Sequence, residues 1–362
     1  MSSIYLQIQD KIYRKHFADW LADPSPDAKP YQFLFRDLNM HTSLKVFCGD
    51  YISDENCKEI SDKYWLITKA LELVNFPFPF PGTKVWHAIQ ARKITVRHLS
   101  AAAAASKKNM LAGGEANCLL DHWVNEILAA KRYREGKDQG VERPNLIVRE
   151  YSDYEMSLVL FSFIFASQDA MSSSITYGFQ HLADYPDVLA KVREEQYRVR
   201  GTDVDSAITI DQLDDMPYTN AVCREVLRHR PPVIMVPYKT TRPFAISDDY
   251  TVPSGTMIIP SFWNSLHDPE VYPDPESFKP ERWMPGGANQ DSTDSKNWLV
   301  FGAGAHRCIG AFCCLTSLLV LCADFGLAGQ SYVMMHMAAV FGSASMLMDW
   351  KHERTELSDE IK

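Results

Sequence analysis

A long apolar run in the middle of the chain constrains the fold most strongly. Residues 155–179 are mostly apolar and predict one helix about 37 Å long, at a rise of about 1.5 Å per residue. A helix of this length and composition does not suit the surface of a small domain, because its apolar side chains need cover from neighbouring elements. We therefore expect it to run through the core of a mainly helical protein.

The sequence around this run predicts more helices, followed by small strands. In residues 4–21 apolar side chains recur at spacings of three and four, which is typical of an amphipathic helix. Residues 75–83 alternate Phe with Pro, so no helix can persist there, and these rings either face the core or touch lipid. After His229, prolines and glycines separate short apolar runs, a pattern typical of small strands and loops. No repeat or linker divides residues 1–362, which predicts a single domain.

Composition excludes some classes of function. The chain is 46% hydrophobic and 23% charged, as globular proteins are, and its net charge of -9 gives no basic surface for nucleic acid. Its eight cysteines lack the dense, regular spacing of a secreted disulfide framework, so we expect mostly free thiols in a reducing compartment. The apolar stretch 311–323 is followed by Asp324 and is shorter than the roughly 20 residues of a membrane-spanning helix, so no anchor is predicted.

One cysteine lies in a glycine-punctuated loop. The string FGAGAHRCIG, residues 301–310, has the pattern F-x-x-G-x-x-x-C-x-G. Gly304 and Gly310 lack a Cβ, so the backbone beside Cys308 can let a porphyrin face come within bonding distance of the sulfur. A cysteinate axial ligand donates electron density to haem iron and favours O–O cleavage, and backbone amides of the loop can tune that donation. Taken alone, such a cysteine is more often an inert buried thiol.

Charged residues upstream support the haem interpretation. In REVLRHRPP, Glu225 and Arg228 are three residues apart on one helix face and can pair, although such a pair on a surface contributes little. The string FKPERW adds Arg282, which can complete a buried Glu–Arg–Arg network. The order of the E-x-x-R helix, the segment HDPEVYPDPESFKPERW and the cysteine loop resembles that of the cytochrome P450 superfamily.

The resemblance extends along nearly the whole chain. The strings KVFCGDYISDE, KYWLITKALELVNFPF, FASQDAMSSSITY, LADYPDVLAKVREEQYRVRG and RPPVIMVPY are similar to the fungal sterol C-22 desaturases. This resemblance implies a mainly α fold with small β elements. It implies removal of two hydrogens across C-22 and C-23 of a sterol side chain in ergosterol synthesis. It also implies haem b with an axial cysteinate, dioxygen, an NADPH-dependent reductase flavoprotein, and a place on the cytosolic face of the endoplasmic reticulum membrane.

The resemblance also assigns roles to residues in and around the ligand loop. Cys308 would bind iron, and Glu225, Arg228 and Arg282 would hold the loop in place. His306 stands where many members of the superfamily carry an arginine for a haem propionate. The expected haem-binding set is Phe301, Gly304, His306, Cys308 and Gly310.

The resemblance also implies roles for residues of the long helix and of the segment after the E-x-x-R helix. Asp169 stands where the superfamily has an acid followed by a threonine that helps to deliver protons. Here the next residues are Ala170 and Met171, so the expected hydroxyl is displaced to Ser172. The apolar residues expected to line the substrate side of the haem are Val233, Ile234 and Met235.

Three departures from the family are expected. The chain would begin after the membrane anchor and the early helices of the family, and would stop short of its last strands. The third is a 19-residue insertion after the ligand loop, residues 311–329, because the family pattern resumes only at Gln330. The segment is interpreted as a translated intron or a mispredicted exon boundary, although a tolerated loop insertion is the alternative. Residues 330–350 then predict an apolar helix that packs under the porphyrin.

Two other functions are open on the sequence. A zinc-binding module could use His306, Cys308, Cys313 and Cys314, since histidine and thiolates suit tetrahedral zinc, although their spacing matches no common zinc motif. The second alternative is a catalytically inactive remnant that still binds sterol. It is open because the chain departs from the family pattern at the three places described above.

Overall fold

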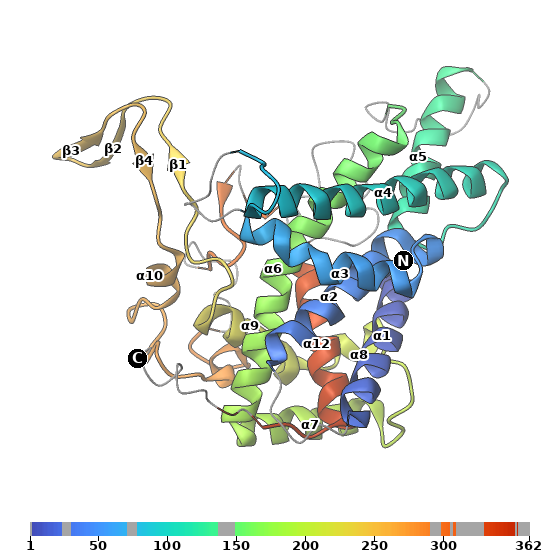
Figure 1. Cartoon of the computed structure of the whole chain (residues 1–362). Coiled ribbons are helices and arrows are strands. Elements are labelled where there is room, and N and C mark those ends of the chain that lie inside the picture. Colours follow the sequence, from blue (N-terminus) through green and yellow to red (C-terminus); the bar gives the residue numbers. More distant parts are fainter. Residues whose placement is uncertain are drawn as a thin grey trace.

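The structure is a computed structural model, and it describes residues 2–23, 30–70, 78–136, 149–289, 298–304, 307–308, 329–351 and 353. Helices dominate (Figure 1). The long helices are α1 (Ser2–Ala22), α2 (Tyr31–Cys48), α3 (Asp54–Lys69), α4 (Lys84–Leu111), α5 (Leu119–Arg134), α6 (Asp153–Asp184), α7 (Pro186–Arg200), α9 (Pro217–His229) and α12 (Gly329–Leu347). The short helices are η1 (Gly49–Tyr51), α8 (Ile210–Asp214), α10 (Phe262–Leu266) and η2 (Pro280–Trp283). The strands are β1 (Tyr238–Lys239), β2 (Phe244–Ser247), β3 (Tyr250–Val252) and β4 (Met257–Ile258).

Helix α6 is the central element, as the long apolar run predicts. It packs against α2, α4, α9 and α12, and Figure 1 shows it running through the helical body. The helix is longer than predicted at both ends. At its start Ser152 and Glu155 form a capping box, each accepting from the other's backbone amide, so the helix begins at Asp153. At its end the residue before Pro186 is disfavoured in helical geometry, and the helix stops at Asp184.

Two apolar clusters divide the core along α6. Met156, Leu160 and Ile164 belong to a cluster with residues of α2, α3, α4 and α5. Further along the helix, Met171 and Ile175 belong to a second cluster with residues of α1, α7, α9 and α12. The boundary between the clusters therefore falls at the polar residues 167–169, which matters for the site described below.

Helix α12 approaches α6 closely because Gly178 has no side chain. A Cβ at this position would lie 1.9 Å from the ring of Phe341 in α12, so the ring or the helix would have to move. The apolar helix predicted for residues 330–350 is thus present, although it ends at Leu347. Of the expected insertion, residues 311–328 lie outside the described part of the chain, and Gly329 is the first residue of α12.

The strands form two small antiparallel pairs, β1 with β4 and β2 with β3. Tyr238 pairs with Ile258 in the first, and Phe244 with Val252 in the second. In Figure 1 the strands stand at the edge of the molecule opposite α5. Small strands after His229 are therefore confirmed, and they lie outside the helical core.

The Phe-Pro segment does not face the core in the part that the structure describes. Phe78 and Phe80 are 59% and 61% exposed, so the core-facing alternative is wrong for these two rings. Residues 75–77 lie outside the described residues. Among the described residues, α6 is long and apolar enough to cross a membrane by length and composition, but other helices of the core pack against it.

A buried histidine joins α12 to α1. The His336 side chain is fully buried, and its Nδ1 accepts from the Tyr13 hydroxyl at 2.9 Å and from the Gln9 amide at 3.1 Å. Both donors need a neutral ring whose proton is on Nε2, because a protonated Nδ1 accepts nothing. Burial lowers the pKa of His336 to about 3.

Acid is therefore expected to destabilise the fold through His336. The folded pKa lies below the unfolded value of about 6.5, so the unfolded chain binds more protons between these values. The free energy of unfolding should fall by up to about 1.4 kcal/mol for each pH unit below about 6.5 through this residue. Glutamine can accept from Tyr13 but does not titrate, so His336→Gln should show a shallower slope. Denaturant titrations between pH 7 and 4 measure the difference, and parallel curves would contradict the assignment.

Candidate functional site

Two backbone hydrogen bonds hold the candidate ligand loop on the N-terminal side of its cysteine. The Cys308 amide donates to the Phe301 carbonyl at 2.7 Å, and the Arg307 amide donates to the Gly304 carbonyl at 3.1 Å. Gly304 has φ +63°, a left-handed conformation that strains other residues, and a Cβ there would have no heavy atom of the described residues within 4 Å. The backbone thus turns tightly at a position without a side chain, as the close approach of a flat ligand requires.

Cys308 differs from the other cysteines that the structure describes. It is exposed, whereas Cys48, Cys57, Cys118 and Cys223 are buried free thiols. Burial raises the pKa of all four buried thiols, that of Cys57 to about 12, which disfavours the thiolate form that would bind iron. Among the described residues Cys308 is therefore the accessible thiol, so the alternative of a buried cysteine is wrong.

These features fit a haem. The accessible thiol of Cys308 is the donor that haem iron needs, and the turn at Gly304 adds no side chain beside it. Phe301 is buried in the core next to the loop, so it anchors the start of the turn. His306 and Gly310, the other members of the expected haem-binding set, lie outside the described residues.

Glu225 is the centre of a buried network. Helix α9 places Glu225 and Arg228 on one face, and both side chains are 0% exposed. Arg228 donates twice to the carboxylate, from Nε and Nη2, both at 2.9 Å. Arg282 in η2 donates from Nε at 3.1 Å. The pair is thus not the weak surface ion pair that the sequence also allowed.

Two further donors complete the carboxylate, and backbone carbonyls satisfy the arginines. The Lys279 amide and the Trp283 indole each donate to Glu225 at 2.9 Å. The carbonyls that accept from the two arginines are those of Leu266, Pro273, Asp274 and Ser277. Lys279 and Trp283 both belong to the FKPERW string, but the sequence does not predict them as donors. Nothing in a sequence shows that a backbone amide and an indole point at a carboxylate.

The structure places Asp169 and Ser172 in different environments. Asp169 lies at the edge of α6, half exposed, and pairs with Arg36 of α2 at 2.5 Å. Ser172 is only 2% exposed, and its hydroxyl donates to the Gln168 carbonyl at 2.6 Å, one turn back in its own helix. The structure therefore does not bring the two expected proton-delivery residues to one accessible surface.

The expected substrate-lining residues follow α9 and are accessible. Val233, Ile234 and Met235 are 39%, 45% and 50% exposed. The segment is held to the chain before α10, because the Phe262 amide donates to the Ile234 carbonyl and Met235 pairs with Ser261. Apolar side chains held in place but uncovered suit contact with an apolar ligand.

No group of three or more His, Cys, Asp or Glu that could hold a metal ion occurs in the described part of the chain. Of the zinc ligands considered above, His306, Cys313 and Cys314 lie outside that part. The arrangement that the structure does describe, a single accessible thiol, suits a metal that is otherwise held by a porphyrin.

The chain matches one protein family over most of its length. Residues 42–324 match the family model of cytochrome P450. The match covers most of the chain, so the chain belongs to the cytochrome P450 family. The mainly α fold with small β elements is that of the family.

Fungal sterol enzymes are similar over almost the whole chain. The chain is 43% identical to the C-22 sterol desaturase ERG5A of Gibberella zeae in an alignment of 366 positions that covers 99% of this chain and 64% of that protein. It is 43% identical to the C-22 sterol desaturase erg5 of Aspergillus fumigatus over 368 residues, 99% of this chain and 66% of that protein. The chain thus spans slightly less than two thirds of the length of these relatives.

A solved structure shares the fold. The retinoic acid-bound cyanobacterial CYP120A1 matches with a TM-score of 0.66 at 20% identity, over 93% of this chain and 66% of that one.

Proposed function

We propose that this protein is a haem-thiolate oxidoreductase that introduces a double bond between C-22 and C-23 of a sterol side chain in ergosterol synthesis. The observation that carries the proposal is the accessible Cys308 in its glycine turn, in a chain that is 43% identical to two C-22 sterol desaturases. The cofactor is haem b, and the electron donor is an NADPH-dependent reductase flavoprotein. The site of action is the cytosolic face of the endoplasmic reticulum membrane.

The overall reaction balances with these partners. The sterol loses two hydrogens, NADPH and one proton supply two more, and dioxygen takes up all four as two molecules of water. Haem with a cysteinate ligand supplies the oxidation of unactivated C–H bonds when it is bound. The protein has to bind the sterol, hold the ligand loop and deliver protons.

Different residues of the described part of the chain suit each of these tasks. Cys308 provides the axial thiolate, and the Glu225 network fixes the segment from η2 toward the loop. Val233, Ile234 and Met235 offer an accessible apolar wall to the sterol side chain. Exposed Phe78 and Phe80 can contact lipid, from which a sterol would enter.

Turnover of a labelled sterol tests the proposal. A sterol saturated between C-22 and C-23 and deuterated at both carbons is incubated with the protein, the reductase and NADPH. We expect a product that has lost one label from each carbon, measured by mass spectrometry, and no product without NADPH. Iron with protoporphyrin should be found in the purified protein.

The alternatives give different results in the same experiment. A sterol-binding remnant would bind the sterol without loss of label. A zinc module would contain zinc and no porphyrin.

A further inference from the structure

Helix α4 carries the most one-sided charge of the described helices. It contains four lysines, two arginines and no aspartate or glutamate. The net charge of the whole chain is -9, and the six positive charges of α4 leave -15 for the remaining residues. The net charge of the chain therefore hides one strongly basic element.

Three of these cations lie on the outward face of α4. The opposite face of the helix is buried against α3, α5 and α6. On the outward face Lys93, Arg97 and Lys108 are exposed, and the exposed Ala101 and Ala104 lie between them in the sequence. At about 100° per residue, the three cations fall within about 60° of one another around the helix. We call Lys93, Arg97 and Lys108 the α4 basic stripe.

The stripe is only partly neutralised within the protein. Neither Lys93 nor Lys108 forms an ion pair with another described residue. Arg97 lies 3.6 Å from Glu59 of α3, and its side chain is 65% exposed. Glu59 is also bound by Lys63 at 3.0 Å, so this carboxylate does not neutralise Arg97 alone. The stripe thus presents positive charge at the surface.

Exposed apolar side chains flank the stripe along the chain. Phe78 and Phe80 are 59% and 61% exposed and precede the first residue of α4, and Leu111, its last residue, is 70% exposed. Cations beside exposed apolar groups suit the surface of an anionic membrane, because the cations bind lipid phosphates and the apolar groups enter the headgroup boundary. A purely ionic partner would use the cations but would leave the apolar side chains in water.

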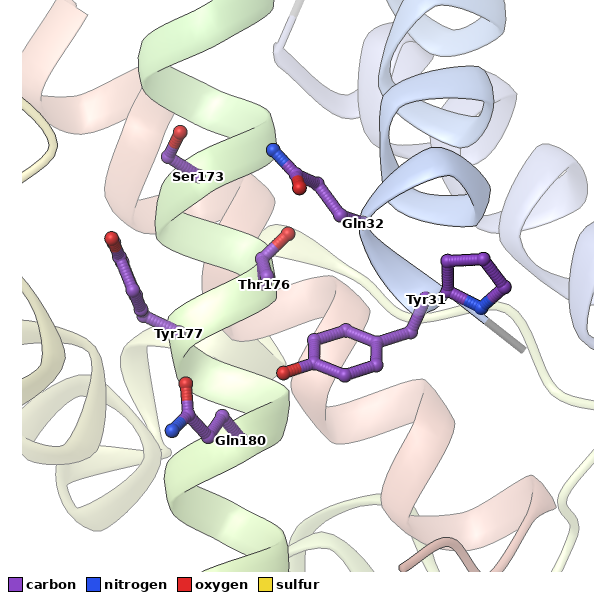
Figure 2. Close-up of a pocket in the computed structure, with 7 residues that line it drawn as sticks. Tyr31, Gln32, Ser173, Thr176, Tyr177 and Gln180 are labelled. Atoms are coloured by element: carbon purple, nitrogen blue, oxygen red, sulfur yellow. The ribbon is translucent and has the colours of Figure 1, made fainter. Parts of the chain in front are cut away.

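The groove between the start of α2 and α6 offers no competing site for an anion. Its lining residues are all uncharged (Figure 2), and they are Pro30, Tyr31, Gln32, Ser173, Thr176, Tyr177 and Gln180. Figure 1 shows α4 on the opposite side of the helical body from α7. Lysines of other helices can therefore serve as controls for those of α4.

We propose that the α4 basic stripe binds the surface of a bilayer that contains anionic phospholipids. Lys93, Arg97 and Lys108 bind lipid phosphates and lay α4 along the membrane, while Phe78 and Phe80 enter the headgroup boundary. The proposal specifies the face of the protein that meets the membrane and the lipid charge that this face selects. It is independent of the proposed reaction, because binding to lipid needs neither haem nor turnover.

Flotation of the full chain with vesicles tests the proposal. The probes are vesicles of phosphatidylcholine alone and vesicles that also contain phosphatidylserine. Loss of one lysine near an anionic surface weakens binding about fivefold, so Lys93→Gln/Lys108→Gln should bind the anionic vesicles about twentyfold more weakly. The wild type should prefer the anionic vesicles, and high salt should reduce that preference.

The matched control is Lys11→Gln/Lys191→Gln, which removes two exposed lysines from α1 and α7 and should bind both kinds of vesicle as the wild type does. Phe78→Ser/Phe80→Ser tests the apolar contact separately. This variant should bind both kinds of vesicle more weakly and keep the preference for the anionic ones. Circular dichroism confirms that each variant is folded.

Three results would overturn the proposal. They are equal binding of the wild type to the two kinds of vesicle, equal losses in the two lysine double variants, and binding of a soluble polyanion such as heparin without binding to vesicles. The proposed function has a separate outcome. Protein that floats with anionic vesicles through α4 but has no thiolate haem spectrum would refute the proposed reaction and leave this inference intact.

Discussion

Replacement of Glu225 with alanine is expected to destabilise the fold by about 3 to 5 kcal/mol and to abolish soluble, haem-containing protein. The substitution removes the acceptor of five hydrogen bonds and leaves Arg228 and Arg282 buried without a counter-charge. Domains of this kind are stable by only about 5 to 15 kcal/mol, so the loss is a large part of the total. Arg228→Ala should have an effect of similar size, because it leaves Glu225 buried and short of two donors.

The measurements are soluble yield, haem per polypeptide and the midpoint of denaturant unfolding. Lys58→Ala is a suitable control, since Lys58 pairs with Asp62 on the surface of α3, with both side chains more than half exposed. Such a pair contributes about 0.3 to 0.5 kcal/mol. Glu225→Ala protein with the yield and haem content of the wild type would show that the network does not hold the fold.

Replacement of Cys308 with alanine is expected to abolish thiolate ligation completely while leaving the helices formed. The Cys308 side chain is exposed, so its removal creates no cavity in the core. Circular dichroism should therefore stay close to that of the wild type, and the thiolate band of the reduced, carbon monoxide-bound protein should be absent.

Cys223→Ala separates loss of the ligand from loss of a cysteine. Cys223 is fully buried in the core between the helices, so its replacement should lower stability through lost packing and keep the thiolate band. A Cys308→Ala protein that keeps the band would identify a different iron ligand.

The sequence predicts the helical frame well, because that frame follows from local patterns. The apolar run that forms α6 and the Glu225–Arg228 spacing both depend on residues close together in the chain. The limits of α6 depend on a capping box and a proline. Exposure of Phe78 and Phe80 could not be predicted, because a Phe-Pro pattern fixes the backbone and not its surroundings.

The site is predicted less completely, since its contacts join distant segments. Arg36 and Asp169 are 133 residues apart, and no local pattern around Arg36 distinguishes it from any other helical arginine. The burial of Ser172 depends on which helices pack around α6, and the sequence does not show that. The roles of His306, Gly310 and residues 311–328 stay predictions, because these positions lie outside the described residues.

The absorption spectrum of the reduced protein with carbon monoxide tests the central claim most directly. The position of the Soret band depends on which protein atom binds the iron, and this atom should be the sulfur of Cys308. We predict the red-shifted Soret band of a thiolate-ligated haem, lost in Cys308→Ala and retained in Cys223→Ala. A histidine-type band, or no haem band at all in protein that is folded and supplied with haem, would contradict the assignment of this chain as a haem-thiolate enzyme.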